Sequence, residues 1–216
     1  MRYFRRLTID ETVYWGTLLF AATSVGYLLI TLIHTATLEE TSFSSESTYM
    51  RKQARVLIVD TSLGEIRINL LRSQAPTTVN NFVSLAQSGF YDNTKFHRIV
   101  PGLLVQGGDP LSREADQELY GTGGPGYVFD DEIRGIKMER GVVAMANLGR
   151  PKTNGSQFFI LVSPDAPQME GKYTIFGRVV FGMEVVDAIN KVRISDKKIP
   201  IEPVLVHSIK LERPQD

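Results

Sequence analysis

The sequence predicts a mainly β protein, an antiparallel sheet closed into a barrel with two helices, preceded by one N-terminal transmembrane helix. Three observations support this prediction. Most of the chain after residue 54 consists of short β-branched segments broken by glycines, two segments have helical periodicity, and residues 13–33 contain no charge. The 216 residues give room for one domain of about 160 residues and an appendage.

Composition excludes several classes of function. The 24 basic and 24 acidic residues cancel, and no run of lysine and arginine exceeds two residues, so the footprint of a nucleic-acid-binding protein is absent. The chain has no cysteine, which excludes disulfides, thiol nucleophiles and thiolate zinc sites. Its three histidines are scattered in the sequence and predict neither a metal site nor a catalytic triad, so we expect no cofactor.

Residues 13–33 are expected to span a membrane. As a helix, these 21 residues would reach about 31 Å, the thickness of the hydrocarbon core of a bilayer. Two aromatic residues suited to the membrane interface, Tyr14 and Trp15, lie at the start of this segment. Three arginines precede it (Arg2, Arg5 and Arg6), and two glutamates follow it (Glu39 and Glu40). The excess of positive charge before the span places residues 1–12 in the cytosol and the rest of the chain on the far side.

A cleavable signal peptide is the alternative for this segment. Its apolar core would be long, since such cores run about 7–15 residues. Ala36 is the only small residue at a plausible cleavage position, and His34 stands where a second small residue is expected. We therefore favour a signal anchor at 13–33, followed by a polar, flexible stem at 34–53 and a domain at 54–213.

The domain begins with a predicted hairpin, residues 55–60 and 65–70 around a turn at 61–64. A helix then starts at Pro76 and stops before Gly89, because proline suits the first turn of a helix and glycine its end. Its apolar face consists of Val79, Phe82, Val83 and Ala86. A second helix is expected at 183–192, with Met183, Val186, Ile189 and Val192 on its buried face.

The other expected strands are short segments, residues 141–146, 158–162, 173–180 and 204–211. In the last of them, residues 205, 207, 209 and 211 alternate with their neighbours, which predicts a strand with two unlike faces. Phe96, Phe158 and Phe176 are expected in the core.

Two blocks carry the functional signal. Residues 96–109 (FHRIVPGLLVQGGD) place one arginine among apolar residues and a glutamine eight positions later, and residues 154–159 (NGSQFF) add two amides and an aromatic pair. Together the blocks resemble the cyclophilins, a family of peptidyl-prolyl isomerases. The resemblance covers the domain and implies an eight-stranded barrel closed at its ends by two helices.

An arginine beside an apolar pocket suits prolyl isomerisation. Rotation about an X–Pro bond has a barrier of about 18–20 kcal/mol, because the nitrogen lone pair is delocalised into the carbonyl group. In the twisted state the lone pair returns to the prolyl nitrogen, so a fixed donor there stabilises only the transition state. The resemblance implies that Arg98 is this donor and that Gln106 holds it in place.

The remaining site residues are also carried over from the resemblance. The residues expected to line the proline pocket and its surroundings are Leu103, Leu104, Phe159, Met169 and Tyr173. Asn147 and Gln157 are expected to bind the peptide backbone, and Gly121 and Ala146 to form a neighbouring pocket.

The pattern departs from the commonest cyclophilin groove at the pocket. Leu103 stands in place of an aromatic residue, Gln168 aligns with the usual rim tryptophan, and Tyr173 replaces a histidine. Because that tryptophan donates a hydrogen bond to cyclosporin in the family, we expect weak binding of the drug. The same changes leave a second hypothesis open, a binding module that holds proline-containing segments without turning them over.

Three further motifs have structural interpretations. Residues 121–126 (GTGGPG) fit the dinucleotide-binding fingerprint, but no strand precedes them and Pro125 interrupts them, which predicts a turn beside the groove. His97 is expected to be a structural hydrogen-bonding residue. The glycosylation motif at Asn154 is expected to stay unmodified because it folds away.

The sequence therefore predicts a membrane-anchored prolyl isomerase, monomeric, acting on proline-containing polypeptides in the endomembrane lumen. The last four residues, 213–216 (RPQD), are not an ER-retention signal, which favours the Golgi over the ER. A bacterial inner-membrane protein facing the periplasm would have a similar sequence.

Overall fold

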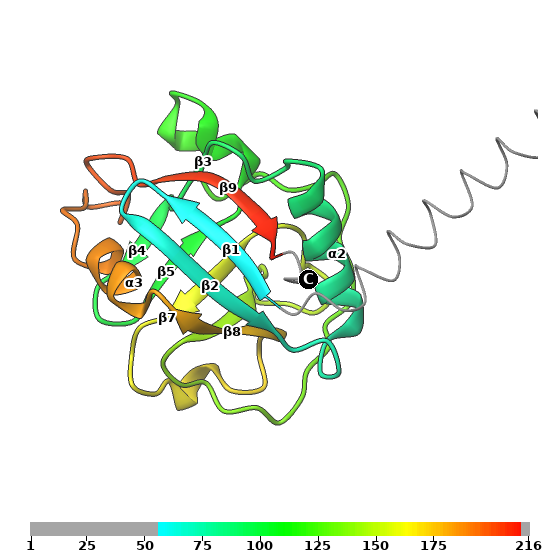
Figure 1. The fold of residues 1–216 in the computed structure, drawn as a ribbon. Helices are drawn as coiled ribbons and strands as arrows, with labels where there is room; N and C mark the ends of the chain where they lie inside the picture. The colour runs from blue at the N-terminus through cyan, green and yellow to red at the C-terminus, as the bar shows by residue number, and fades with distance from the viewer. Residues whose placement is uncertain (1–55, 213–216) are drawn as a thin grey trace, which may run out of the picture. The chain divides into compact units, whose positions relative to one another are not determined.

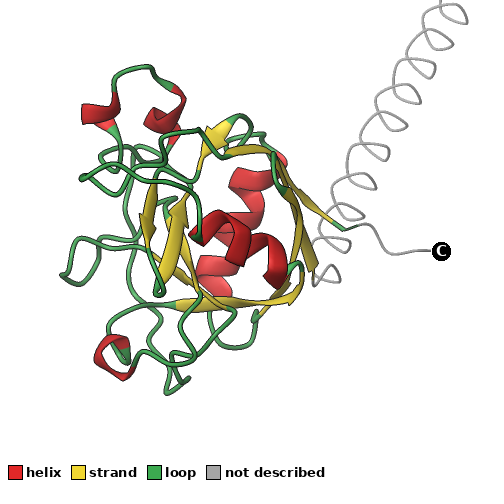
Figure 2. Cartoon of the chain, turned by 90° about the vertical axis from the view of Figure 1, so that its left-hand side faces the viewer, coloured by secondary structure: helices red, strands yellow, loops and turns green. Residues whose placement is uncertain are grey.

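The structure is a computed structural model that describes residues 56–212. Its elements, in chain order, are β1 (Val56–Thr61), β2 (Gly64–Leu70), α2 (Pro76–Gln87), β3 (Thr94–Lys95), β4 (Arg98–Val100), β5 (Leu104–Gly107), η1 (Pro110–Arg113), η2 (Gln117–Leu119), β6 (Val142–Met145), β7 (Phe158–Leu161), η3 (Pro167–Met169), β8 (Ile175–Phe181), α3 (Met183–Asn190) and β9 (Leu205–Leu211). The strands form one antiparallel sheet in the order β3-β9-β1-β2-β8-β6-β7-β5-β4. The sheet curls between the two helices, with α2 at one end and α3 at the other (Figures 1 and 2).

The predicted fold class is confirmed, and the predicted closed barrel of eight strands is corrected. The described residues form nine strands in a half-barrel, and no ladder joins the edge strands β3 and β4. Only Phe96 and His97 separate these two strands in the sequence, so the chain itself links the edges. The number of strands is nine because residues 94–100 form two strands with different partners: β3 pairs with β9, and β4 pairs with β5.

The first hairpin forms where it was predicted. Thr61 lies opposite Gly64, which leaves a loop of two residues between β1 and β2. The hydroxyl of Thr61 donates to the Gly64 carbonyl at 2.6 Å and accepts from the amide of Leu63 at 3.1 Å. Gly64 has a φ of +132°, a conformation that favours glycine.

The described domain begins and ends at one place. β9 lies beside β1, with Leu211 opposite Leu57. The amide of Glu212 donates to the carbonyl of Val56 at 2.9 Å. The last residues of the domain are therefore hydrogen-bonded to its first.

Both predicted helices are present. In α2, Pro76 lies in the first turn, but Ala75 offers no side-chain cap. Instead Glu132, from a distant loop, accepts from the amides of Thr77 and Thr78 at 3.1 and 2.8 Å. Burial alone would raise the pKa of Glu132, yet these hydrogen bonds outweigh it and lower that pKa. The other helix, α3, ends two residues earlier than predicted, at Asn190.

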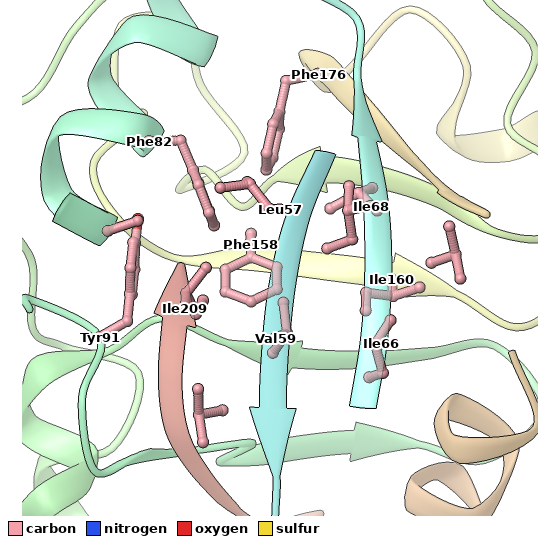
Figure 3. Close-up of a cluster of buried hydrophobic side chains, with 14 of the residues drawn as sticks. Leu57, Val59, Ile66, Ile68, Phe82, Tyr91, Phe158, Ile160, Phe176 and Ile209 are labelled. Carbon is pink, nitrogen blue, oxygen red and sulfur yellow. The ribbon is translucent and has the colours of Figure 1, made fainter. Parts of the chain in front are cut away.

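The main core fills the space inside the curled sheet. Figure 3 shows side chains from strands and α2 converging there, and they include Leu57, Val59, Ile66, Ile68, Phe82, Tyr91, Phe158, Ile160, Phe176 and Ile209. A second apolar cluster contains alternate residues of β6 and β7, such as Ala144 and Phe159. These two strands are buried on both faces, which explains their unbroken apolar sequence. Phe96, Phe158 and Phe176 are buried as predicted.

The predicted alternation in β9 is only partly correct. Asp60 pairs with Ser208 and Thr61 with Val206, so the ladder skips His207. This bulge reverses the phase of the strand, because an extra residue moves every later side chain to the opposite face. Ser208 and Ile209 are consequently both buried.

The predicted membrane span at 13–33 lies outside the described residues, as do the tail at 1–12 and the stem at 34–53. Of the helices found in residues 56–212, none has the length and hydropathy needed to cross a bilayer.

Candidate active site

A short hairpin carries both residues predicted to be catalytic. Between β4 and β5, the amide of Leu103 donates to the carbonyl of Val100 at 3.0 Å and closes a four-residue turn. Pro101 and Gly102 occupy its centre, and Gly102 has a φ of +69°. Proline followed by a glycine of positive φ is typical of a type II turn, so the local sequence determines this reversal of the chain.

The register of the hairpin brings Arg98 and Gln106 together. They lie directly opposite each other in the β4–β5 pair. Ile99 and Val105 point to the other face and are fully buried. The Arg98 guanidinium is exposed to solvent, and its Nη1 donates to Oε1 of Gln106 at 3.0 Å. The predicted pairing of the two side chains is therefore present in the structure.

Further hydrogen bonds fix the orientation of Gln106. Its Nε2 donates to Oε1 of Gln157 at 3.0 Å. The Nε2 of Gln157 donates in turn to the carbonyls of Gly121 and Gly123, at 2.9 Å each. The two backbone carbonyls can only accept, so Gln157 points its Nε2 at them and its Oε1 at Gln106. Gln106 therefore points its Nε2 at Gln157 and its Oε1 at Arg98, whose guanidinium can only donate.

The hairpin borders a cavity of about 530 Å³, called the first cavity here. The residues that line it are His97, Arg98, Leu104, Gln106, Gln117, Glu118, Tyr120, Gly121, Ala146, Asn147, Phe159, Met169, Tyr173, Lys197 and Ile199. One part of its wall is apolar, with Leu104, Phe159 and Met169 largely buried. The rings of Phe159 and Tyr173 meet edge to face, with centroids 5.1 Å apart.

A second cavity of about 780 Å³ adjoins the first, and the two share Gln106, Gly121, Ala146 and Asn147. Its other lining residues are residues 122–128, Leu148, Thr153, Gly155, Ser156 and Gln157. Residues 121–126 thus form an irregular loop beside the cavities, with no helix after it, as predicted. The amide of Asn147 is held in place, since its Nδ2 donates to the Lys172 carbonyl at 2.9 Å and its Oδ1 accepts from the Gly149 amide at 3.0 Å.

Ten of the eleven predicted site residues line one or both cavities: Arg98, Leu104, Gln106, Gly121, Ala146, Asn147, Gln157, Phe159, Met169 and Tyr173. Leu103 is the exception. It lies in the hairpin turn, half-buried against the second apolar cluster. The lining residues of the first cavity that were not predicted are His97, Gln117, Glu118, Tyr120, Lys197 and Ile199. Gln117, Glu118 and Tyr120 lie in or next to η2, and Lys197 and Ile199 lie in the loop before β9. None of these five residues belongs to a motif of the sequence.

The prediction for His97 is wrong in one respect. The side chain is 2 % exposed, as a structural residue should be, but neither ring nitrogen has a hydrogen-bond partner in the described part of the chain. Burial lowers the pKa of His97, and the attraction of Asp109 opposes that shift only in part. The ring is therefore neutral at pH 7, and it contributes no charge to the cavity beside Arg98.

The curled sheet and this site together define a protein that accommodates an apolar group beside a fixed guanidinium, with amide groups nearby for a peptide backbone. Comparison with known proteins identifies the family. Residues 56–211 match the family described as cyclophilin type peptidyl-prolyl cis-trans isomerase/CLD.

Two curated relatives illustrate the match. Peptidyl-prolyl cis-trans isomerase-like 1 of Gibberella zeae is 42% identical over 155 residues, which are 69% of this chain and 90% of that protein. Peptidyl-prolyl cis-trans isomerase ppi1 of Schizosaccharomyces pombe is 43% identical over 151 residues, 68% of this chain and 93% of the relative.

A solved structure agrees with these relatives. The Cryptosporidium parvum cyclophilin type peptidyl-prolyl cis-trans isomerase, crystallised in the presence of the dipeptide Ala-Pro, superposes with a TM-score of 0.67 at 36% identity. The match covers 73% of this chain and 98% of that one. This chain belongs to the cyclophilin-type peptidyl-prolyl cis–trans isomerases.

Proposed function

We propose that this isomerase acts on X–Pro bonds of polypeptides that are folding in the endomembrane lumen, and that residues 13–33 anchor it to the membrane. The observation that carries the catalytic part is the hydrogen bond of 3.0 Å between Arg98 and Gln106 at the edge of the first cavity. It holds a permanent cation beside an apolar wall without neutralising its charge.

In this mechanism the proline ring occupies the apolar part of the first cavity, against Leu104, Phe159 and Met169. Burial of the ring orients the X–Pro bond and excludes water on that side. The Arg98 guanidinium then donates to the prolyl nitrogen as the bond twists and the lone pair localises. One preorganised donor of this kind is worth roughly 3–4 kcal/mol. That is close to the approximately 4 kcal/mol needed for a thousandfold acceleration.

The peptide backbone on either side of the proline needs polar partners. We propose that Asn147 and Gln157 supply them, since both amides line the second cavity and are already fixed by hydrogen bonds to backbone groups. Gly121 and Ala146 leave room for the peptide between the two cavities. A preorganised site of this type loses little side-chain entropy when the peptide binds.

The proposed location follows from the sequence alone. The arginines before residues 13–33 and the glutamates after them favour a type II orientation, with the catalytic domain in the lumen.

The catalytic part is tested by measuring cis–trans exchange of an Ala-Pro-Phe peptide with the full-length protein in mild detergent. We expect acceleration by the wild type, a loss of about 10²–10³-fold in kcat/KM for Arg98→Ala, and a smaller loss for Gln106→Ala. Arg193→Ala serves as the matched control, because Arg193 is exposed and lines neither cavity. If the wild type binds the peptide without accelerating exchange, the protein is a proline-peptide binding module instead.

A further inference from the structure

One wall of the first cavity comes from a segment that stands away from the sheet. Residues 110–120 contain the short helices η1 and η2, which project beyond the strands in Figure 2. From this segment, Gln117, Glu118 and Tyr120 line the first cavity. The cavity thus has a polar part in addition to its apolar part.

The segment is firmly attached to the domain. The fully buried carboxylate of Asp109 accepts from the amide of Leu111 at 2.8 Å and from the amide of Gly121, so it ties both ends of the segment together. Lys95 donates through Nζ to the hydroxyl of Tyr120 at 2.7 Å, and Arg113 donates to the carbonyl of Asp92 at 2.9 Å. The polar part of the cavity, formed by Gln117, Glu118 and Tyr120, is therefore held in place by hydrogen bonds to the rest of the domain.

An ion pair crosses the polar part of the cavity. Nζ of Lys197, in the loop before β9, contacts Oε1 of Glu118 on η2. Both side chains are largely exposed, at 62 % for Lys197 and 74 % for Glu118. Each therefore remains accessible to a bound peptide, and the pair can be exchanged for a contact with that peptide at small cost.

The order of strands places this pair on the far side of Arg98 from the second cavity. Asn147 follows β6, and the sheet then continues through β7, β5 and β4, which carry Phe159, Gln106 and Arg98. Beyond β4 lies the loop with Lys197, since the amide of Ile99 donates to the carbonyl of Lys198 at 2.8 Å. A peptide laid across these strands meets Asn147, the apolar part, Arg98 and Lys197 in turn.

The charges around the polar part are unbalanced. Of the residues lining the first cavity, Arg98 and Lys197 are cations, Glu118 is the only carboxylate and His97 is neutral. Glu118 is already paired with Lys197, whereas the described contact of Arg98 is with an uncharged amide. The residues that line the first cavity therefore carry a net positive charge.

We propose that Glu118 and Lys197 determine specificity by reading the charge of the residue that follows proline, and that they favour an acidic residue over a basic one. This inference rests on the proposed function, in which proline occupies the apolar part, and it adds that the residues before proline lie toward Asn147. An acidic side chain in the polar part accepts from Lys197. A basic one is repelled by Arg98 and must displace Lys197 from Glu118.

The test compares peptides that differ only in the residue after proline, which is Glu, Gln or Lys, using the full-length protein in mild detergent. In low salt we expect kcat/KM for the Glu peptide to exceed that for the Lys peptide by roughly three- to fivefold, the size of an exposed ion-pair effect. High salt should reduce this ratio, because the charges are exposed and become screened.

Two variants separate charge recognition from a structural role. Lys197→Gln removes the attractive cation and should bring the ratio close to one. Glu118→Gln frees Lys197 and should raise the ratio above that of the wild type. A pair that only braced the wall would give changes in the same direction for both variants, which would overturn the proposal. Lys210→Gln is the matched control, because Lys210 is an exposed lysine of β9 outside both cavities.

The remaining outcomes are also decisive. Equal kcat/KM for the three peptides, with normal acceleration of each, overturns this inference and leaves the proposed function intact. No acceleration of the Gln peptide would overturn the proposed function, and this inference with it.

Discussion

At the scale of single residues, His97 makes the stability of the domain depend on pH. Its ring is buried, and this burial lowers its pKa more than the attraction of Asp109 raises it. The unfolded chain therefore binds a proton at His97 more readily than the folded one does. Stability then rises with pH between the lowered pKa and the ordinary value of about 6.5, and it falls as the solution is acidified through that range.

We expect the urea midpoint of the wild type to fall between about pH 7 and pH 5, with a smaller fall for His97→Gln. His207→Gln is the matched control, because His207 lies exposed at the bulge of β9. The slopes are compared rather than the absolute midpoints, since glutamine packs differently from histidine. Equal slopes in the wild type and His97→Gln would show that the buried ring is not responsible.

Gln168 determines the second prediction at this scale. It lies exposed on η3, next to the cavity-lining Met169, but it does not itself line the first cavity. Glutamine at this position leaves the protein without the indole N–H that donates a hydrogen bond to cyclosporin in the family, so binding of the drug should be weak. Titration calorimetry tests this, and Gln168→Trp should tighten binding. A dissociation constant in the low nanomolar range for the wild type would contradict the prediction.

Residues of the site were predictable where the family resemblance could be carried over position by position. Arg98 and Gln106 are eight positions apart in one block, and the hairpin brings them opposite each other. Glu118 and Lys197 lie 79 residues apart, and their contact depends on how the short helix η2 packs against the loop before β9. Leu103 was predicted to line the pocket but is not among the residues lining either cavity. It packs from the hairpin turn against the second apolar cluster, of which the cavity-lining Leu104 is itself a member.

At the scale of elements, Asn190 joins α3 to the catalytic hairpin. Its Nδ2 donates to the carbonyls of Val100 and Leu104 at 3.0 and 3.1 Å, and its Oδ1 accepts from the amide of Gly102 at 2.8 Å. One buried side chain therefore holds the turn from both strands. The position of Arg98 on β4 depends on this contact with the end of a helix.

Asn190→Ala should reduce the free energy of unfolding by roughly 2–4 kcal/mol, because three hydrogen bonds are lost and their backbone partners are left buried. We also expect a lower kcat/KM for prolyl exchange, since the hairpin that carries Arg98 loosens. Urea denaturation and the exchange assay measure the two effects. Glu184→Ala, on the exposed side of the same helix, is the control. Unchanged stability of Asn190→Ala would show that the turn holds without this contact.

Elements were predictable where the sequence shows a repeated or unbroken apolar pattern. Both helices and the first hairpin show several repeats of their period and were found within two residues. β3 and β4 were not predicted, because strands of two and three residues contain too few side chains to show alternation. β5 was also missed, although β6 and β7, which have four residues as well, were predicted from their unbroken apolar sequences. The bulge in β9 was missed for a different reason: it depends on pairing with β1, and the sequence of β9 alone does not contain it.

At the scale of the whole molecule, the motif at Asn154 allows the proposed location to be tested. Asn154 is fully buried, and its Nδ2 donates to Oδ1 of Asp131 at 2.9 Å. Once the domain has folded, this nitrogen is inaccessible to a glycosyltransferase. We therefore expect no mass shift on glycosidase treatment of the native protein, even if the domain is lumenal.

A second motif provides the positive control. Gly135→Asn combined with Lys137→Thr creates a glycosylation site in an exposed loop. In a eukaryotic secretory cell this variant should gain a glycan that Asn154 lacks. An unmodified variant would argue against a lumenal domain, and a glycan on Asn154 of the wild type would show that modification precedes folding.

The hydrogen bond between Glu212 and Val56 has a consequence for how the chain can be reconnected. Because the domain begins and ends at one place, a short linker between these residues would close it into a ring without strain. New termini could then be opened at Gly135, where a side chain would meet no atom within 4 Å. The fold therefore does not require β1 to come first in the sequence. A circularly permuted domain should adopt the same fold, form the same site and keep its isomerase activity.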